Sequence, residues 1–94
     1  MISAIVLINA EVAHIPEVAA AIAEIAGVSE VYSVTGDVDL IAVVRVRAHE
    51  EFADVIADQL NKVSGVLGTQ THIAFQTYSK HDLDAAFSLG LDDD

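Results

Sequence analysis

Residues 40–46, with the sequence LIAVVRV, decide the fold that we expect for this chain. Alternate residues of a β-strand point to opposite sides of the sheet, and here both alternating rows are apolar until Arg45. A strand of this kind is covered on both sides and lies in the middle of a sheet. Residues 2–8, with the sequence ISAIVLI, follow the same pattern. The sequence therefore predicts two central strands.

Each central strand opens one half of the chain, and the two halves have the same design. In the first half, Pro16 suits the opening turn of a helix that we expect over residues 16–26. In the second half, an apolar stripe predicts a helix over residues 49–63. Further strands over residues 28–34 and 66–78 complete the two halves. The stripe consists of Phe52, Val55, Ile56, Leu60 and Val63.

The resulting order, βαββαβ, predicts an α+β fold of the ferredoxin-like type. We expect a four-stranded antiparallel sheet with two helices on one face. Residues 1–80 would form this domain. Residues 81–94 would add a short C-terminal helix and an acidic tail, because Asp82 suits a helix N-cap and the chain ends in three aspartates.

Two helices cover only one face of such a sheet, so the apolar row on the other face needs another partner. Leaving several of these side chains in water forgoes about 1.5 to 3 kcal/mol for each, which rivals the stability of a small domain. We therefore expect a second subunit to pack sheet to sheet. The predicted interface residues are Ile5, Leu7, Ile41, Val43, Ile73 and Phe75.

The composition excludes several classes of function. The chain has no cysteine, which excludes thiolate nucleophiles and cysteine-based metal sites. Its net charge of −11 opposes direct binding to nucleic acid. The four histidines lack the spacing of a metal motif, and we expect no cofactor. No apolar run could span a bilayer and the N-terminus lacks a basic signal region, so we expect a cytoplasmic protein.

Residues 34–40, with the sequence VTGDVDL, form the most informative motif. A polar hairpin turn alone explains such a string. As a binding site, exposed N–H groups around Gly36 could receive a carboxylate, while Asp37 or Asp39 receives an ammonium group. A free amino acid carries both groups.

This hairpin, the helix end at residues 63–66 and the sequence TQT at residues 69–71 resemble the ligand-binding (RAM) domain of the Lrp/AsnC transcriptional regulators. The resemblance covers residues 2–78 and implies a dimeric α/β barrel, octamers or decamers, and amino-acid effectors held between dimers. By position, it assigns ligand binding to Thr35, Gly36, Asp37, Val38, Asp39, Thr69 and Thr71.

The resemblance is to members of the family that lack the helix-turn-helix DNA-binding domain, since Met1 directly precedes the first predicted strand. It implies control of transcription through a partner, for which a full-length Lrp/AsnC regulator is one candidate. A small dimeric α/β-barrel enzyme of the monooxygenase or isomerase type is the alternative. We expect no enzyme, because no nucleophile with a nearby base is visible. A scaffold without a ligand and an ACT-like regulatory domain remain open as well.

Overall fold

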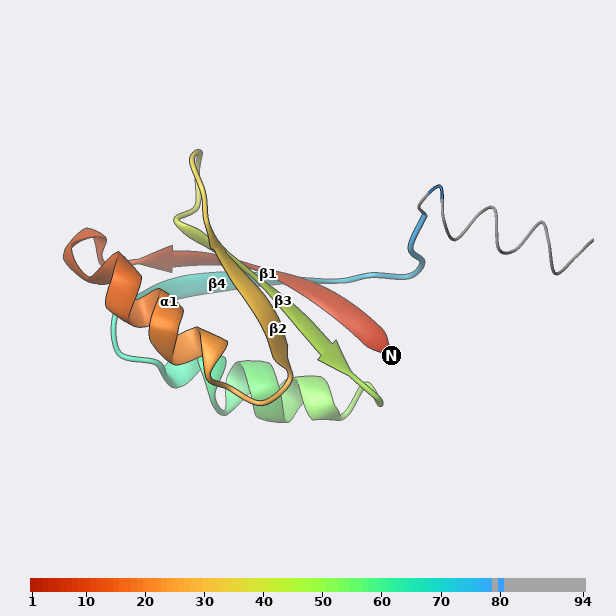
Figure 1. The fold of residues 1–94 in the computed structure, drawn as a ribbon. Helices are drawn as coiled ribbons and strands as arrows, with labels where there is room; N and C mark the ends of the chain where they lie inside the picture. The colour runs from red at the N-terminus through yellow and green to blue at the C-terminus, as the bar shows by residue number, and fades with distance from the viewer. Residues whose placement is uncertain (79, 81–94) are drawn as a thin grey trace, which may run out of the picture.

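The computed structural model of the chain describes residues 1–78 and 80. At its centre is a four-stranded antiparallel sheet in the order β2-β3-β1-β4 (Figure 1). The strands are β1 (Ile2–Ala10), β2 (Val28–Ser33), β3 (Leu40–Val46) and β4 (Val66–Ile73). β1 and β3 are the inner strands, as their two apolar rows predict. The ferredoxin-like α+β fold is confirmed.

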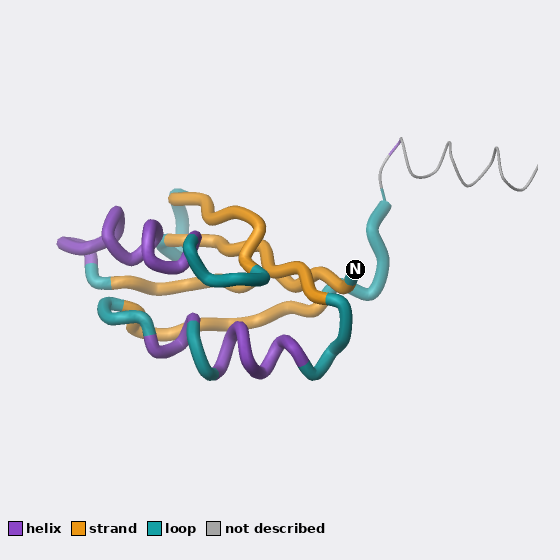
Figure 2. Tube along the Cα trace, turned by 60° about the horizontal axis from the view of Figure 1, so that its bottom comes forward, coloured by secondary structure: helices purple, strands orange, loops and turns teal. Residues whose placement is uncertain are grey.

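Two helical segments pack on the same side of this sheet and run roughly along its strands (Figure 2). The first consists of the 3₁₀ turn η1 (Val12–His14) and the helix α1 (Ile15–Ala23). Pro16 lies in the first turn of α1, where its missing N–H leaves no hydrogen bond unmade. α1 ends earlier than the predicted residue 26, and a turn leads from it into β2.

The second helical segment is less regular than its apolar stripe predicts. Its central turn is the π-helix η2 (Ala53–Ala57), and its last turn is the 3₁₀ helix η3 (Leu60–Lys62). The expectation of one continuous helix over residues 49–63 is therefore wrong. Phe52 and Leu60 are nevertheless both buried, on either side of the wide turn. The wide turn of η2 therefore lies between two buried residues of one helical segment, as single π-turns do inside longer helices.

The core lies between the sheet and these helical segments. From the helices it receives mainly branched side chains, with Val18 and Ile22 of α1 opposite Val55 and Leu60 of the second segment. From the sheet it receives every second residue of the two inner strands. These strand residues are Ala4, Val6, Ile8, Ala10, Leu40, Ala42, Val44 and Val46, each at most 4% exposed.

The other row of the inner strands forms the open face of the sheet. Ile5 pairs with Val43, and Leu7 pairs with Ile41, so the four side chains are neighbours. Ile5 is 42% exposed, and the other three are half-buried. The predicted uncovered apolar row is therefore present on β1 and β3.

The outer strand β4 contributes differently from the prediction. Ile73 pairs with Ala4, so it shares the helix-covered face rather than the open face. The residues of β4 that lie on the open face include His72, which pairs with Ile5, and Gln70, which pairs with Leu7. Phe75 lies beyond the end of β4 and is fully exposed, so the pleat of the sheet does not assign it to a face. The placement of Ile73 in the open row is thus wrong.

A glycine follows each helical segment, before the next strand begins. Gly27 and Gly65 both have positive φ angles, of 99° and 96°. A Cβ atom on Gly65 would lie 2.6 Å from Cγ2 of Val18, and one on Gly27 would lie 2.9 Å from Cγ2 of Val55. Each half therefore ends its helix with a glycine that packs against the helix of the other half.

The chain leaves the sheet soon after β4. The N–H of Ala74 still donates to the carbonyl of Ser3 at 2.9 Å, and the following residues extend away from the domain (Figure 1). The predicted strand to residue 78 is therefore too long. The helix predicted within residues 81–94 falls outside the described residues. Among those that are described, no helix is long and apolar enough to cross a membrane.

Candidate functional site

The hairpin between β2 and β3 is anchored to the end of β1 through Asp39. The N–H of Asp39 donates to the carbonyl of Ile8, and the N–H of Ala10 donates to Oδ2 of Asp39, each at 2.9 Å. The N–H of Val34 also donates to the carbonyl of Asp39 at 3.1 Å. Two hydrogen bonds therefore join the base of the hairpin to β1, and the third closes the hairpin itself.

The tip of the hairpin carries backbone donors that the protein leaves open. Among the described residues, none accepts a hydrogen bond from the N–H of Gly36 or Asp37. Gly36 has a φ of 112°, and a Cβ atom there would meet nothing within 4 Å. Both residues are exposed. Successive free N–H groups of this kind can bind an anionic group such as a carboxylate.

The remaining predicted hairpin residues divide between the tip and the base. Thr35 and the carboxylate of Asp37 are exposed beside the open N–H groups. Val38 and Asp39 are half-buried at the base. Asp37 is therefore available to an ammonium group, whereas one oxygen of Asp39 already holds Ala10. The sequence did not separate the anchored Asp39 from the exposed Asp37, because the two aspartates look alike in it.

Thr69 and Thr71 lie on β4, at the other edge of the sheet from the hairpin strands. Ile8 pairs with Leu40 on one side and with Thr69 on the other, so β1 separates the hairpin strand β3 from β4. Because adjacent strands are about 4.8 Å apart, β3 and β4 are about 10 Å apart. Within one chain, the two threonines therefore do not adjoin the hairpin tip.

Thr69 has a partner that the sequence did not reveal. Its hydroxyl donates to Oδ1 of Asn61, on η3, at 2.7 Å. Both residues line a small hollow of ≈ 270 Å³ with Val66, Leu67 and Gly68. Thr71 is exposed on the same face of β4. Asn61 was missed because an asparagine near the end of a helix has no distinctive sequence pattern.

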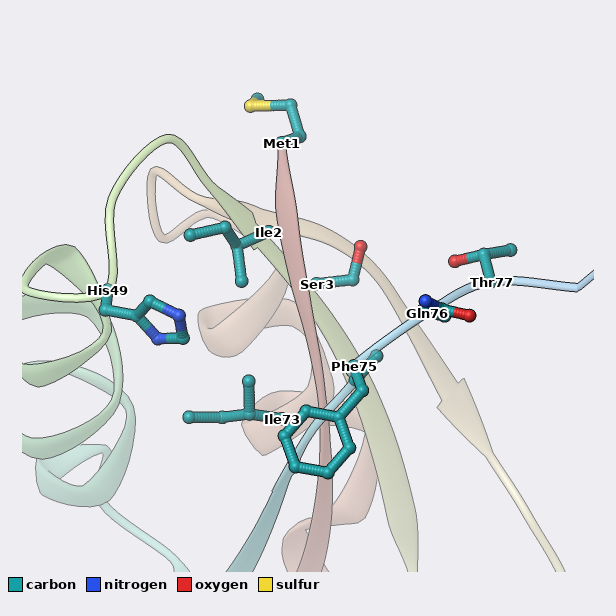
Figure 3. A pocket seen from close by; sticks show the side chains of 9 residues that line it. Met1, Ile2, Ser3, His49, Ile73, Phe75, Gln76 and Thr77 are labelled. Atoms are coloured by element: carbon teal, nitrogen blue, oxygen red, sulfur yellow. The ribbon is translucent and has the colours of Figure 1, made fainter.

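A larger hollow of ≈ 340 Å³ lies at the opposite end of the sheet, where β1 begins (Figure 3). The imidazole of His49 points toward Ile2 and Ile73 in this hollow. Phe75 and Gln76 line it from the segment that follows β4. None of these residues belongs to the predicted ligand set, and no hairpin residue lines this hollow. The predicted ligand site is therefore not preformed as this cavity.

The family is established by a match over most of the chain. The Lrp/AsnC ligand binding domain matches residues 3–83. The HTH-type transcriptional regulator FL11 of Pyrococcus horikoshii is 31% identical over 77 residues, which are 82% of this chain and 50% of FL11. The chain thus spans about half the length of that regulator.

Solved structures agree with this match. TTHA0845 from Thermus thermophilus superposes with a TM-score of 0.80 at 42% identity, covering 85% of this chain and 100% of TTHA0845. The feast or famine regulatory protein Rv3291c from M. tuberculosis, complexed with L-methionine, superposes with a TM-score of 0.69 at 26% identity, covering 85% of this chain and 54% of Rv3291c. The relatives named here include transcriptional regulators. The chain belongs to the Lrp/AsnC ligand-binding domain family.

Proposed function

We propose that this domain senses a free amino acid through the hairpin of residues 35–39 and passes the signal on by changing its assembly. The observation that carries the proposal is the pair of open N–H groups at Gly36 and Asp37 beside an exposed carboxylate. The base of this hairpin is held by three hydrogen bonds, so the donors are presented by a fixed support.

The chemistry of the hairpin suits the two charged groups of an amino acid. The N–H groups of Gly36 and Asp37 receive the carboxylate, and the side chain of Asp37 receives the ammonium group. Thr35 adds a hydroxyl beside them. The L-methionine complex of Rv3291c, a relative at 26% identity, supports this class of ligand.

Assembly completes the site. Because Thr69 and Thr71 lie at the far edge of the sheet, we propose that they meet the hairpin of another subunit. The open face of Ile5, Leu7, Ile41 and Val43 supports a dimer in which two sheets close into a barrel. Octamers or decamers then bring hairpins and β4 strands of different dimers together around the effector.

The output is regulatory rather than catalytic. An effector that binds one assembly state better than another shifts the population toward that state. The charge of −11 opposes direct contact with DNA, so another domain or a partner, such as a full-length Lrp/AsnC regulator, makes that contact. The regulators among the relatives support this role over an enzyme.

A thermal-shift screen of the common amino acids, run beside light scattering, tests the proposal. A ligand that binds only the folded state raises the melting temperature, by an amount that grows with its concentration above Kd. We expect one or a few amino acids to raise it and the mass to exceed that of a dimer. A screen in which no amino acid raises the melting temperature contradicts the sensing role.

Hairpin variants then test the site itself. Gly36→Val strains a backbone with φ of 112°, and Asp37→Ala removes the proposed ammonium partner. Both are expected to abolish the thermal shift while leaving the dimer intact. Asp58→Ala serves as the control, because it removes an exposed carboxylate that follows η2 and does not belong to the hairpin. Full binding by both hairpin variants would exclude this site.

A further inference from the structure

The ionisable side chains of the sheet all lie on its open face. β1 contains none, and the other three strands contain Glu30, Tyr32, Arg45 and His72. Glu30 and Tyr32 pair with Val43 and Ile41 of the open row, and Arg45 follows Val43 in that row. His72 pairs with Ile5 of the same face. A partner that covers this face therefore also covers these four groups.

Two of these groups neutralise each other within one chain. Nη1 of Arg45 lies 3.7 Å from Oε1 of Glu30. At neutral pH the strands thus bring no net charge to the open face, although the whole chain carries −11. Two copies can meet at this face without the repulsion that their other surfaces create. This charge distribution favours a second copy as the partner.

His72 has no such counter-charge. Its side chain is exposed, and its neighbours Ile5 on β1 and Gln70 on β4 are uncharged. Among the described residues, no carboxylate lies within ion-pairing distance of its imidazole. In the single chain, water can solvate the protonated form of this side chain.

The carboxylates nearest to this face are too far away to serve His72. Glu30 is on β2, three strand spacings or about 14 Å from β4. Asp39 is bound to the N–H of Ala10, which lies five residues along β1 from Ile5, or about 17 Å. A protonated His72 therefore stays without a carboxylate of its own chain.

Closing two sheets into a barrel changes the surroundings of this side chain. The two open faces become the interior, so each copy encloses one His72 beside Ile5. An enclosed imidazolium without a carboxylate loses its hydration, whereas a neutral imidazole loses far less. Histidine ordinarily changes its charge between about pH 8 and pH 5. The barrel therefore encloses a group whose charge depends on pH.

We propose that the dimer is pH-sensitive: it forms while His72 is neutral and dissociates as His72 takes up a proton. This inference rests on the proposed sheet-to-sheet dimer and adds its regulation. Separated chains bind more protons than the dimer, by up to two for each dimer, so the dimer weakens as the pH falls. Overall charge acts in the opposite direction, because a falling pH reduces the mutual repulsion of two acidic chains.

Sedimentation velocity over a dilution series of the full chain tests the proposal by measuring the Kd of the first association step. The ionic strength is held constant between about pH 8 and about pH 5.5. We expect the Kd to rise at the lower pH by about tenfold to a hundredfold, the upper limit being the exclusion of two protons. A Kd that is unchanged or lower at the lower pH overturns the proposal.

Variants assign the pH response to one side chain. His72→Gln keeps a polar side chain without the charge, so its Kd should be nearly the same at both pH values. His14→Gln is the matched control, because His14 belongs to η1 and not to the open face. It should keep the full response of the wild type. A His72→Gln dimer that still weakens at the lower pH overturns the proposal.

The same measurements separate this inference from the barrel on which it rests. If the wild type dimerises near pH 8, Ile41→Asp abolishes the dimer and the Kd does not change with pH, the pH response is refuted and the barrel stands. A chain that is monomeric near pH 8, or a dimer that Ile41→Asp leaves intact, overturns the barrel and with it this inference.

Discussion

The two faces of the inner strands carry the same kinds of side chain and meet different surroundings. On β1, Ile8 is fully buried under the helices, whereas Ile5 is 42% exposed on the open face. On β3, Leu40 is fully buried and its neighbour Ile41 is only half-buried. The covered face therefore stabilises the single chain, while the apolar residues of the open face gain full burial only through association.

The largest expected effect is on the covered face. Leu40→Ala removes a fully buried side chain and leaves a cavity, so it should lower the free energy of unfolding by about 2 to 5 kcal/mol. Urea denaturation at low protein concentration measures this loss. Ile41→Ala, one residue away on the open face, is the matched control and should lose clearly less. Equal losses in the two variants would remove the contrast between the faces.

The next effect tests the open face by association. Ile41→Asp places a carboxylate among apolar neighbours, so a sheet-to-sheet dimer should dissociate. If the proposed dimer forms, it would contribute about 2.7 kcal/mol at a protein concentration one hundred times its Kd, and the variant would lose this contribution. Melting temperatures over a range of protein concentrations detect it: the wild type should show a dependence and the variant none. An Ile41→Asp variant that keeps the molar mass of the dimer would contradict the sheet-to-sheet barrel.

A smaller effect is expected where the two halves meet on the covered face. Gly65→Ala introduces a Cβ atom 2.6 Å from Cγ2 of Val18 at a φ of 96°, so it should cost about 1 to 3 kcal/mol of stability. Gly68→Ala is the matched control, because a Cβ atom there meets nothing within 4 Å. Thermal unfolding compares the two variants. Similar melting temperatures would show that the helices yield easily at this contact.

The sequence predicted the inner strands better than the outer strand, for a physical reason. Residues 2–8 and 40–46 are apolar on both rows, so their central place does not depend on which row faces the helices. β4 has two mixed rows, and only its pairing with β1 decides which of them is covered. The pair Ala4 and Ile73 makes that decision, and no pattern within β4 reveals it. Ile73 was misplaced for this reason.

For the second helical segment and for the candidate site, the sequence predicted which residues matter but not their exact geometry. The apolar stripe from Phe52 to Val63 correctly predicted which residues are buried or partly buried, because burial depends on the side chains. It did not predict the π-turn in η2, which depends on how these residues meet the sheet. The hairpin motif likewise located Asp37 and Asp39, but their different roles depend on the end of β1, which is distant in sequence.

The smallest expected effect concerns the rim of the open face. Tyr32 pairs with Ile41 there and is half exposed, and Glu30 lies on the same face. As a hydrogen-bond acceptor, the Glu30 carboxylate raises the pKa of the Tyr32 phenol above 10.0. The neutral phenol is therefore favoured in the folded chain. This small contribution to stability is complete below pH 10.0 and is lost as the pH rises through the folded pKa.

The ultraviolet absorbance of the phenolate measures this pKa. The chain has two tyrosines, so Tyr78→Phe leaves Tyr32 as the only phenol to titrate. Its midpoint should lie above 10.0 and should fall when Glu30→Gln removes the charge. Glu17→Gln, on α1, is the control and should leave the midpoint unchanged. A midpoint at or below 10.0 would mean that the edge of the open face does not hold these two side chains together.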